Sequence, residues 1–473
     1  MNIEKVLKLA SDNDVANVDL KFTDLYGGLH HISIPVESLR SELFENGIGL
    51  DGSSIPGFKS SGASDMIMRP DPQTATLDPF WDRPTLTMFG SVYEIDDRIP
   101  FPLDPRQVVQ KAENYLKSTG IADRSLWGPE FEFNIFDSVK IINKTSHVSY
   151  EIESSEAGFS SKVENCGRPY AIPYQRGYHS APPRDLYFNI RDAICAHAKD
   201  FGIKVKYHHH EVGSTGQTEI EIEHVGAVEA GDTAIIIKYL CKMVSQEFGF
   251  CITFMPKPIY NEAGNGMHFH QHLFKGDEPV FYNKNGYAGL SDTALYYIGG
   301  LLTHGPALLA FTNPSTNSYK RLVPGFEAPI KTIFGLGNRS AAVRIPKYAT
   351  EPAKKRIEFR PPDGSCNAYL AVAAQLMAGI DGIINKIDPR KSGLGPFDED
   401  ISKLSDADRD AIPSLPTRIS ETIEAVKKDH KFLLAGNVFT EELIHKVTNK
   451  LSSDDREIQN RPHPYEMELY FDS

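Results

Sequence analysis

The stretch Glu219-Ile220-Glu221-Ile222-Glu223 places a carboxylate at every second position, with isoleucine between the carboxylates. Alternation with a period of two is typical of a β-strand, whose successive side chains point to opposite faces of a sheet. The stretch therefore predicts a strand with one acidic face and one apolar face.

Three other short segments alternate in the same way but carry different ionisable groups: Glu130–Glu132, His268–His272 and Arg356–Arg360. If the four strands share a sheet, its polar face collects carboxylates, imidazoles and guanidinium groups. Close carboxylates repel and burial raises the cost of their charge, so bound cations and an anionic substrate would stabilise this face. Each segment alone fits equally well an antiparallel strand with one face in water. Four segments of complementary chemistry favour an enzyme that handles phosphate with metals.

Length and composition are those of an ordinary globular protein of two or three domains, with 473 residues, 40% of them hydrophobic and 24% charged. The formal net charge of -13 argues against a general binder of nucleic acid or of anionic membrane. The five cysteines include no CxxC pair, which favours reduced thiols over disulfides or structural zinc. No signal peptide or apolar run of membrane-spanning length is evident. We therefore expect a cytoplasmic protein without nucleic-acid or membrane partners.

The first hundred residues predict a leading helix, short strands and turns, with Gly27-Gly28 as a hairpin turn. A helix is then expected from Asp104-Pro105 to Gly120, because Asp can cap its start, Pro suits its first turn and Gly can end it. We place the domain boundary here, giving an N-terminal domain of residues 1–104 and a second domain of residues 105–473.

The second domain alternates predicted strands and helices. Residues 145–185 are rich in Ser, Gly, Pro and Tyr and predict a long loop. Helices are predicted at 231–248, 292–311, 366–387 and 417–433. A β-rich first hundred residues followed by mixed strands and helices indicates an α+β fold.

Several sites could hold metal. Glu130 and Glu132 offer hard oxygen ligands, which favour Mg²⁺ or Mn²⁺ over zinc. Glu211 and Glu219 flank a glycine-containing turn that could bring both to one spot. His208-His209-His210 cannot share one strand face, so it is no simple zinc site. His268 and His270, taken alone, fit a structural cluster slightly better than a metal site.

Two further stretches bear on phosphate binding. Gly52–Ser60 nearly matches a P-loop, but Phe58 interrupts the motif and Pro56 removes a backbone donor, so we reject that reading. The loop Asn317–Pro329 is followed by a dense basic run: Arg339, Arg344, Lys354, Lys355, Arg356 and Arg360. Such a run indicates a polyanionic substrate or, alternatively, salt bridges to the acids of the same chain.

Taken together, these stretches resemble bacterial type I glutamine synthetase over essentially the whole chain. The matching motifs are Asp51-Gly-Ser-Ser-Ile, Gly128-Pro-Glu-Phe-Glu, His209-His-Glu-Val, Gly266-Met-His-Phe-His, Asn317-Ser-Tyr-Lys-Arg-Leu-Val-Pro-Gly, Asn338-Arg-Ser, Arg344-Ile-Pro, Arg356-Ile-Glu-Phe-Arg and His463-Pro-Tyr-Glu-Met-Glu-Leu-Tyr. The resemblance implies ATP-dependent ligation of ammonia to glutamate through γ-glutamyl phosphate. It also implies a small β-grasp domain, a large catalytic domain with a curved antiparallel sheet and flanking helices, and a dodecamer of two hexameric rings with sites at subunit interfaces.

The resemblance further implies roles for individual residues. Two Mg²⁺ or Mn²⁺ ions would be held by Glu132, Glu211 and Glu219, and by Glu130, His268 and Glu358. Glutamate would be held by Gly264, Arg321 and Arg360, and ATP by His270, His272, Arg339 and Arg344. Glu327 would close a flap over the intermediate. Asp51, from the adjacent subunit, would take a proton from ammonium.

The chain departs from the family pattern at three places. The family's Asn-Gly-Ser-Gly-Met-His begins with Ala263 here, so Asn265 or Asn261 would have to supply the missing amide. A family lysine is replaced by Ala353, beside Lys354, and His272 replaces a common serine. Two alternatives stay open: a γ-glutamylamide ligase acting on a polyamine or other amine, and a non-catalytic assembly or regulatory homologue. Phe397 falls on the tyrosine that many longer members adenylylate.

Overall fold

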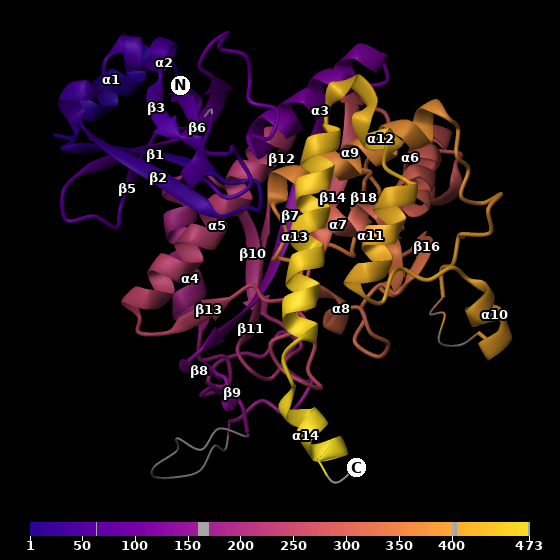
Figure 1. Cartoon of the computed structure of the whole chain (residues 1–473). Coiled ribbons are helices and arrows are strands. Elements are labelled where there is room, and N and C mark those ends of the chain that lie inside the picture. The colour runs from indigo at the N-terminus through magenta and orange to yellow at the C-terminus, as the bar shows by residue number, and fades with distance from the viewer. Residues whose placement is uncertain (63, 159–169, 400, 402–403, 472–473) are drawn as a thin grey trace.

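A computed structural model describes residues 1–473 except 63, 159–169, 400, 402–403 and 472–473. A smaller N-terminal sheet lies against one end of a larger body built on a second sheet (Figure 1). The β-rich start and the mixed second unit agree with the α+β prediction.

The N-terminal sheet has the strand order β2-β1-β6-β4-β3, with β5 paired to β6. Strands β1 and β6 run parallel, and the other pairs are antiparallel. The predicted hairpin at Gly27-Gly28 is confirmed, because Thr23 pairs with Leu29 across it. The elements are α1 (Ile3–Asp12), β1 (Asn17–Thr23), β2 (Leu29–Pro35), α2 (Ser41–Asn46), β3 (Ile48–Asp51), β4 (Asp65–Pro70), β5 (Thr76–Asp78) and β6 (Thr85–Glu94).

Helix α3 (Pro105–Thr119) starts and ends as the sequence predicts. The Asp104 carboxylate accepts a hydrogen bond from the backbone N–H of Arg106 at 2.9 Å and another from that of Val92 at 2.8 Å. Gly120 ends the helix with a φ of +70°, a conformation that glycine adopts without strain. Asp104 thus joins the N-terminal sheet to the second domain, because it bonds to both β6 and α3. The domain boundary between residues 104 and 105 stays a prediction.

The second sheet has the order β10-β11-β7-β14-β18-β17-β16, with β12 and β13 paired to β7 and β15 paired to β14. All these pairs are antiparallel except β16 and β17. The strands are β7 (Arg124–Phe136), β10 (Val205–His210), β11 (Gln217–Ile222), β12 (Val225–Gly226), β13 (Cys251–Thr253), β14 (Met267–Lys275), β15 (Glu278–Pro279), β16 (Lys331–Leu336), β17 (Ala341–Ile345) and β18 (Ile357–Phe359).

The four alternating segments lie on neighbouring strands of this sheet, as predicted. Glu221 pairs with Glu130, Glu130 pairs with His268, and His270 pairs with Glu358. Their apolar partners, such as Phe131, Ile220 and Phe269, are fully buried in the main core. The alternation therefore separates a hydrophobic face from a polar one.

Helices pack on the sheet and on one another. Helix α5 (Ala227–Glu247) and α3 contact β7, and α9 (Ala368–Ile384) contacts α3, α5 and α6. The remaining helices are α4 (Phe188–Asp200), α6 (Asp292–Thr303), α7 (Gly305–Thr312), α8 (Ser318–Arg321), α10 (Asp406–Ala411), α11 (Ile419–Lys428), α12 (Lys431–Leu434), α13 (Glu441–Gln459) and α14 (Pro464–Tyr470).

Two predicted helices are broken. The one expected at 292–311 bends by 73° between α6 and α7. Pro306 causes the break, because it has no N–H for a continuing helix and its ring clashes with the preceding turn. The helix expected at 417–433 stops at Lys428, and Asp429, with φ of −138°, instead pairs with His304.

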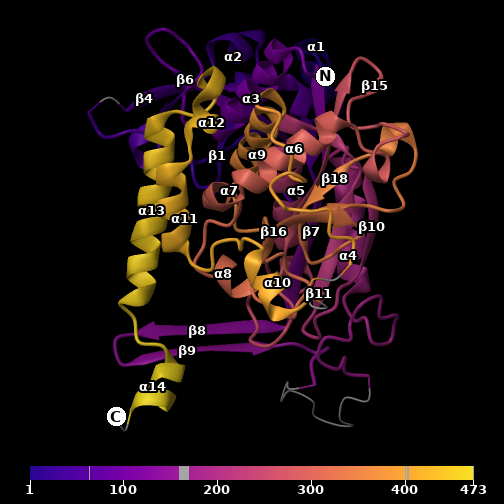
Figure 2. The ribbon, with the colours of Figure 1, turned by 90° about the vertical axis from the view of Figure 1, so that its right-hand side faces the viewer.

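The loop predicted at 145–185 is wrong in part. Strands β8 (Ser138–Lys144) and β9 (His147–Glu153) form a hairpin that projects from the body at the end that also bears α14 (Figures 1 and 2). Val148, Tyr150 and Ile152 alternate with polar residues there, a strand pattern that the Ser- and Gly-rich composition hides. The part of this loop at 159–169 lies outside the described residues.

Within the described ranges, no single helix is long and apolar enough to cross a membrane, although the bent pair α6–α7 passes that test by length and composition. Four of the five cysteines are free thiols: Cys195, Cys241, Cys251 and Cys366. Cys166 lies outside the described residues.

Candidate functional site

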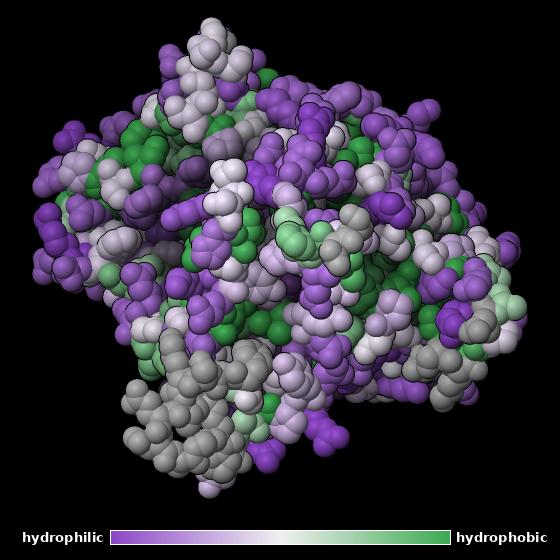
Figure 3. Space-filling view, turned by 60° about the horizontal axis from the view of Figure 1, so that its bottom comes forward, coloured by the Kyte–Doolittle hydropathy of each residue, from purple (hydrophilic) through white to green (hydrophobic). Residues whose placement is uncertain are grey.

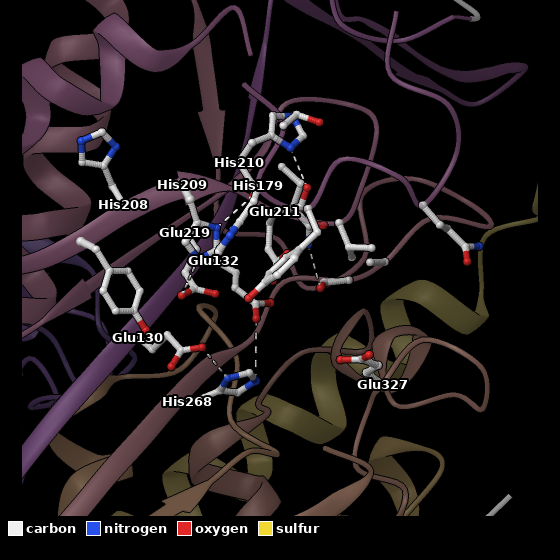
Figure 4. Close-up of a pocket in the computed structure, with 18 of the residues that line it drawn as sticks. Glu130, Glu132, His179, His208, His209, His210, Glu211, Glu219, His268 and Glu327 are labelled. Atoms are coloured by element: carbon white, nitrogen blue, oxygen red, sulfur yellow. Dashed lines mark hydrogen bonds and ion pairs between the residues drawn. The ribbon is translucent and has the colours of Figure 1, made fainter. Parts of the chain in front are cut away.

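A pocket of about 1050 Å³ opens on the polar face of the second sheet (Figure 4). Its walls come from β7, β10, β11 and β14, from the 175–185 segment, and from the 324–328 loop. The predicted site residues that line it are Glu130, Glu132, Glu211, Glu219, Gly264, His268, Arg321, Glu327, Arg339, Arg344 and Arg360. Glu327 lies across the pocket from the glutamates (Figure 4). The fold thus brings residues from between positions 130 and 360 of the sequence to one cavity.

In the described part of the chain, acidic and imidazole side chains converge in three groups whose donor atoms lie within 4.8 Å of one another: Glu130–His268–Glu358, Glu130–Glu132–Glu219 and Glu130–Glu221–His270. The first is one of the two predicted metal sets. The second contains two members of the other predicted set; Glu211, its third member, lines the same pocket. Cross-strand register produces these groups, because Glu132 pairs with Glu219 just as Glu130 pairs with His268.

The carboxylates of this face divide into two electrostatic kinds. Burial opposes ionisation of Glu358, but Arg360, His270 and Arg344 outweigh it and lower its pKa to about 2. Hydrogen bonds from His268 and His270 likewise hold the pKa of Glu130 well below its usual value. Burial and the neighbouring carboxylates instead raise the pKa of Glu211 and of Glu219 well above theirs. Ionisation of Glu211 and Glu219 is therefore unfavourable unless a cation offsets their charge.

The donor chemistry fits Mg²⁺ or Mn²⁺. The groups offer carboxylate oxygens and at most one imidazole each, and none contains a thiolate. Oε2 of Glu211 is buried and has no hydrogen-bond partner among the described residues. A divalent cation would satisfy that oxygen and relieve the repulsion that raises the pKa of Glu211 and Glu219.

The three consecutive histidines diverge, as predicted. Nε2 of His209 lies 3.3 Å from Glu219 on the pocket side. His210 is buried, and its Nε2 lies 3.0 Å from Glu156. His208 lies apart from the group of glutamates (Figure 4), against the ring of Phe188.

The basic run divides between the pocket and internal pairing. Arg344 and Arg360 face the pocket but both pair with Glu358, and Arg339 lies 3.4 Å from Glu327. Arg321 is buried, and its guanidinium donates to the Pro361 carbonyl at 2.8 Å and to Nε2 of His268 at 3.2 Å. Outside the pocket lining, Lys354 pairs with Glu351, Lys355 donates to the Ala288 carbonyl, and Arg356 lies against Tyr348 and His270. Both readings of the run, substrate binding and internal salt bridges, thus describe part of it.

His270 and His272, expected at the nucleotide, lie outside the residues that line the pocket. The ring of His272 packs against His224 with centroids 5.1 Å apart. Neither of its buried ring nitrogens has a hydrogen-bond partner in the described part of the chain, and burial lowers its pKa to about 3. Burial also lowers the pKa of His224, to about 2.

Asn265 does not supply the amide missing at Ala263. It is fully buried, and its side chain donates to Oδ1 of Asn134 at 2.7 Å and to the Met255 carbonyl, and accepts from Gln217. Asn261 is exposed and absent from the pocket lining. This wall of the pocket therefore lacks a free amide from either residue.

Asp51 stands apart from the pocket of its own chain. It is exposed at the end of β3, and its carboxylate accepts hydrogen bonds from Ser53 and Ser54. These bonds lower its pKa to about 2, so Asp51 is an anion at neutral pH.

Sequence reasoning missed several residues of the site. Glu221 belongs to the third donor group, and its alternation with Glu219 was the available signal. Lys206 pairs with Glu221 at 2.7 Å, and Tyr178 stacks on His179 with ring centroids 4.1 Å apart. Tyr178 sits in a segment read only as a loop, and no spacing pattern marks Lys206.

Comparison with known proteins identifies the family of the chain. The glutamine synthetase β-grasp domain matches residues 14–95, and the glutamine synthetase catalytic domain matches residues 102–470. The chain is 45% identical over 476 residues to glutamine synthetase of Mycolicibacterium smegmatis, covering 99% of this chain and 98% of the relative. It is also 45% identical over 469 residues to that of Aquifex aeolicus, covering 99% and 98%.

A solved structure is similar over the same span. The cryo-electron microscopy structure of Plasmodium falciparum glutamine synthetase matches with a TM-score of 0.90 at 28% identity, over 99% of both chains. The N-terminal domain is thus a β-grasp domain and the larger body a glutamine synthetase catalytic domain. The chain belongs to the glutamine synthetase family.

Proposed function

We propose that the chain ligates ammonia to the γ-carboxylate of L-glutamate, converting ATP to ADP and phosphate and forming glutamine. The observation that carries this proposal is the opposition, across one pocket, of carboxylate groups suited to divalent cations and of Arg321, Arg339, Arg344 and Arg360. Full-length similarity to glutamine synthetases supports the same reaction.

A carboxylate is a poor acyl donor, so the γ-carboxylate must first be phosphorylated by ATP. Its oxygen attacks the γ-phosphorus, and ADP leaves. Ammonia then attacks the acyl carbon: a C–N bond forms, the C–O bond to phosphate breaks, and nitrogen loses a proton. The arginines of the pocket would offset the charge of the phosphates and of the two anions brought together.

The two metal sets proposed are Glu130, His268 and Glu358, and Glu132, Glu211 and Glu219. Bound Mg²⁺ or Mn²⁺ would supply charge stabilisation for phosphoryl transfer and orient the phosphates. The chain's own residues hold the substrates: we assign glutamate to Arg321, Arg360 and the Gly264 backbone. We assign ATP to Arg339 and Arg344 in the pocket lining, and also to His270 and His272, which lie outside that lining.

Two residues would control the second step. Glu327 lies on the loop Pro324–Ala328, here called the flap, at the mouth of the pocket. A closed flap would exclude water, which otherwise competes with ammonia for the acyl phosphate. Asp51 is anionic, which suits a group that binds ammonium, and it is exposed. It does not line the pocket of its own chain. We assign it to the site of an adjacent subunit.

Exposed apolar surface supports assembly into a homo-oligomer, proposed as a dodecamer of two hexameric rings in the cytoplasm. Helix α14 and its end expose Met467, Leu469 and Phe471, and the β8–β9 hairpin exposes Ile141 and Tyr150. Seen from the end that bears these elements, the mostly hydrophilic surface is interrupted by apolar patches (Figure 3). Subunit contacts would bury this surface.

Acceptor specificity tests the reaction. Purified protein with ATP, glutamate and Mg²⁺ or Mn²⁺ should release phosphate and form glutamine when ammonia is added, and should not form a γ-glutamylamide with putrescine. Faster turnover with putrescine would assign the alternative amine ligase. Absence of glutamate-dependent phosphate release with any amine would assign the non-catalytic alternative.

A further inference from the structure

The flap has one aromatic side chain, and that side chain lies on a partly buried ammonium group. Nζ of Lys257 lies 3.9 Å from the ring centroid of Phe326, the residue immediately before Glu327. A cation this close to an aromatic face is attracted by the ring quadrupole, and more strongly when both are shielded from water. Lys257 itself does not line the pocket; it lies behind the flap.

Lys257 is itself rigidly held. Its ammonium donates to the Glu262 backbone carbonyl, and its backbone N–H donates to Oδ1 of Asn317 at 2.6 Å. The Asn317 amide returns a hydrogen bond to the Lys257 carbonyl at 3.1 Å. Lys257 is therefore an anchor on the body of the catalytic domain, tied both to its own loop and to the residue that precedes α8.

The flap backbone needs such an anchor. Gly325 has a φ of +95° and Glu327 a φ of +54°, so Phe326 sits between two residues with left-handed backbone. That conformation is unfavourable for glutamate, and surrounding contacts must maintain it. Among the described residues, the Glu327 carboxylate has only a long contact to Arg339, 3.4 Å, and both of these side chains are at least half exposed. The Phe326–Lys257 contact is the more shielded of the two.

We propose that Lys257 is a positioning residue that holds the flap closed through Phe326, and so decides whether ammonia or water reaches the acyl phosphate. This inference rests on the proposed function. Both acceptors break the C–O bond to phosphate: ammonia forms the C–N bond of glutamine, whereas water forms a C–O bond and returns glutamate. An open flap would therefore leave ATP consumption intact but lower the yield of glutamine.

The proposal is tested by the ratio of phosphate released to glutamine formed at saturating ammonia. Wild type should give a ratio near one. Lys257→Met and Phe326→Leu should raise the excess phosphate by between about twofold and thirtyfold, the range that corresponds to a cation–π contact. Lys257→Arg and Phe326→Tyr, which keep cation and ring, should stay near wild type. Lys242→Met, an exposed lysine on α5, is the matched control.

A double variant separates this contact from general damage. If the contact is what matters, the double variant Lys257→Met with Phe326→Leu should release no more excess phosphate than the more affected single variant. The first substitution already removes the interaction. The proposal would be overturned if the excess phosphate of the two folded single variants added up in the double variant. It would also be overturned if active Lys257→Met released one phosphate for each glutamine formed. Wild type that forms no glutamine would instead refute the proposed function.

The pH dependence gives a second readout. Burial and Arg321 lower the pKa of Lys257 to about 8, while Glu262 opposes them; these are the charged groups that act on Lys257, since Phe326 is neutral. As pH rises through 8, the Lys257 ammonium loses its proton and its charge. The ratio of phosphate released to glutamine formed should therefore rise in wild type relative to Lys257→Arg, whose guanidinium stays charged. Equal pH profiles for the two would contradict the proposal.

Discussion

Glu130 and His268 are direct cross-strand partners on β7 and β14, and Oε1 of Glu130 lies 3.1 Å from Nδ1 of His268. The other carboxylate oxygen, Oε2, lies 3.3 Å from Nε2 of His270. One glutamate thus joins two histidines that alternate along β14, and it belongs to all three donor groups of the site.

Removing one metal-binding carboxylate should abolish most activity without unfolding the protein. Glu132→Gln and Glu358→Gln each keep side-chain size but lose a charged ligand, so turnover should fall by about a hundredfold or more. Bound Mn²⁺, counted by electron paramagnetic resonance, should fall in the same variants. The control is Glu223→Gln, an exposed neighbour on the same segment. Near-normal turnover in either variant would contradict the assignment of these carboxylates as metal ligands.

Sites shared between subunits should be restored by mixing two inactive variants. Asp51→Ala lacks the group that reaches a neighbour, and Glu327→Ala lacks the flap carboxylate of its own site. In randomly reassembled oligomers, about a quarter of the sites would contain both wild-type residues. Activity should reappear after dissociation and mixing, but not when intact oligomers are combined. Full activity in a dilute, verified wild-type monomer would contradict shared sites.

His304 should stabilise the fold most at neutral and acidic pH. Its Nδ1 lies 2.8 Å from Asp429, its Nε2 lies 3.0 Å from Asp381, and its ring stacks on Phe432. Burial opposes the charge, but the two carboxylates prevail and raise the pKa to about 9 from a usual 6.5. The folded state therefore binds the proton more tightly than the unfolded state. The resulting stabilisation is complete below pH 6.5 and is lost as pH rises through 9.

The measurement is the melting temperature of His304→Gln against wild type across pH 6 to 10. At pH 6 we expect the free energy of unfolding of the variant to be lower than that of wild type by about 1–3 kcal/mol. This is less than the full pKa shift would give, because both carboxylates are partly exposed to solvent. The deficit should narrow as pH rises through 9. His147→Gln, an exposed histidine on β9, serves as the control. A deficit independent of pH would mean that stacking on Phe432, not charge, accounts for the role of His304.

The chain should not be adenylylated at the position that many longer relatives modify. Phe397 has no hydroxyl, and its backbone N–H donates to the Phe334 carbonyl at 2.8 Å, which docks the segment beside β16. No tyrosine occurs between Tyr369 and Tyr465. Incubation with a family adenylyltransferase and labelled ATP should leave residues 385–410 unlabelled by peptide mapping. Label there, accompanied by lost activity, would show the prediction wrong.

The sequence by itself determined the local structure wherever short-range chemistry decides it. Period-two alternation marked four strands and the face on which each carries charge, and Asp104, Pro105 and Gly120 marked both ends of α3. The family resemblance identified most of the carboxylates and arginines that line the pocket. These signals suffice because caps, turns and side-chain alternation depend on a few neighbouring residues.

Only the tertiary structure decided which of these segments meet. The pairing of Glu130 with both Glu221 and His268 joins positions far apart in the sequence, and register depends on packing that no single strand encodes. The same applies to Lys257 under Phe326, to Lys206 on Glu221 and to His304 between two carboxylates. Asn265 shows the converse: its amide has the right chemistry for the substrate, but burial commits its hydrogen bonds to Asn134 and Met255. The partners available to a polar side chain are set by the fold around it, because buried groups must find their hydrogen bonds within the protein.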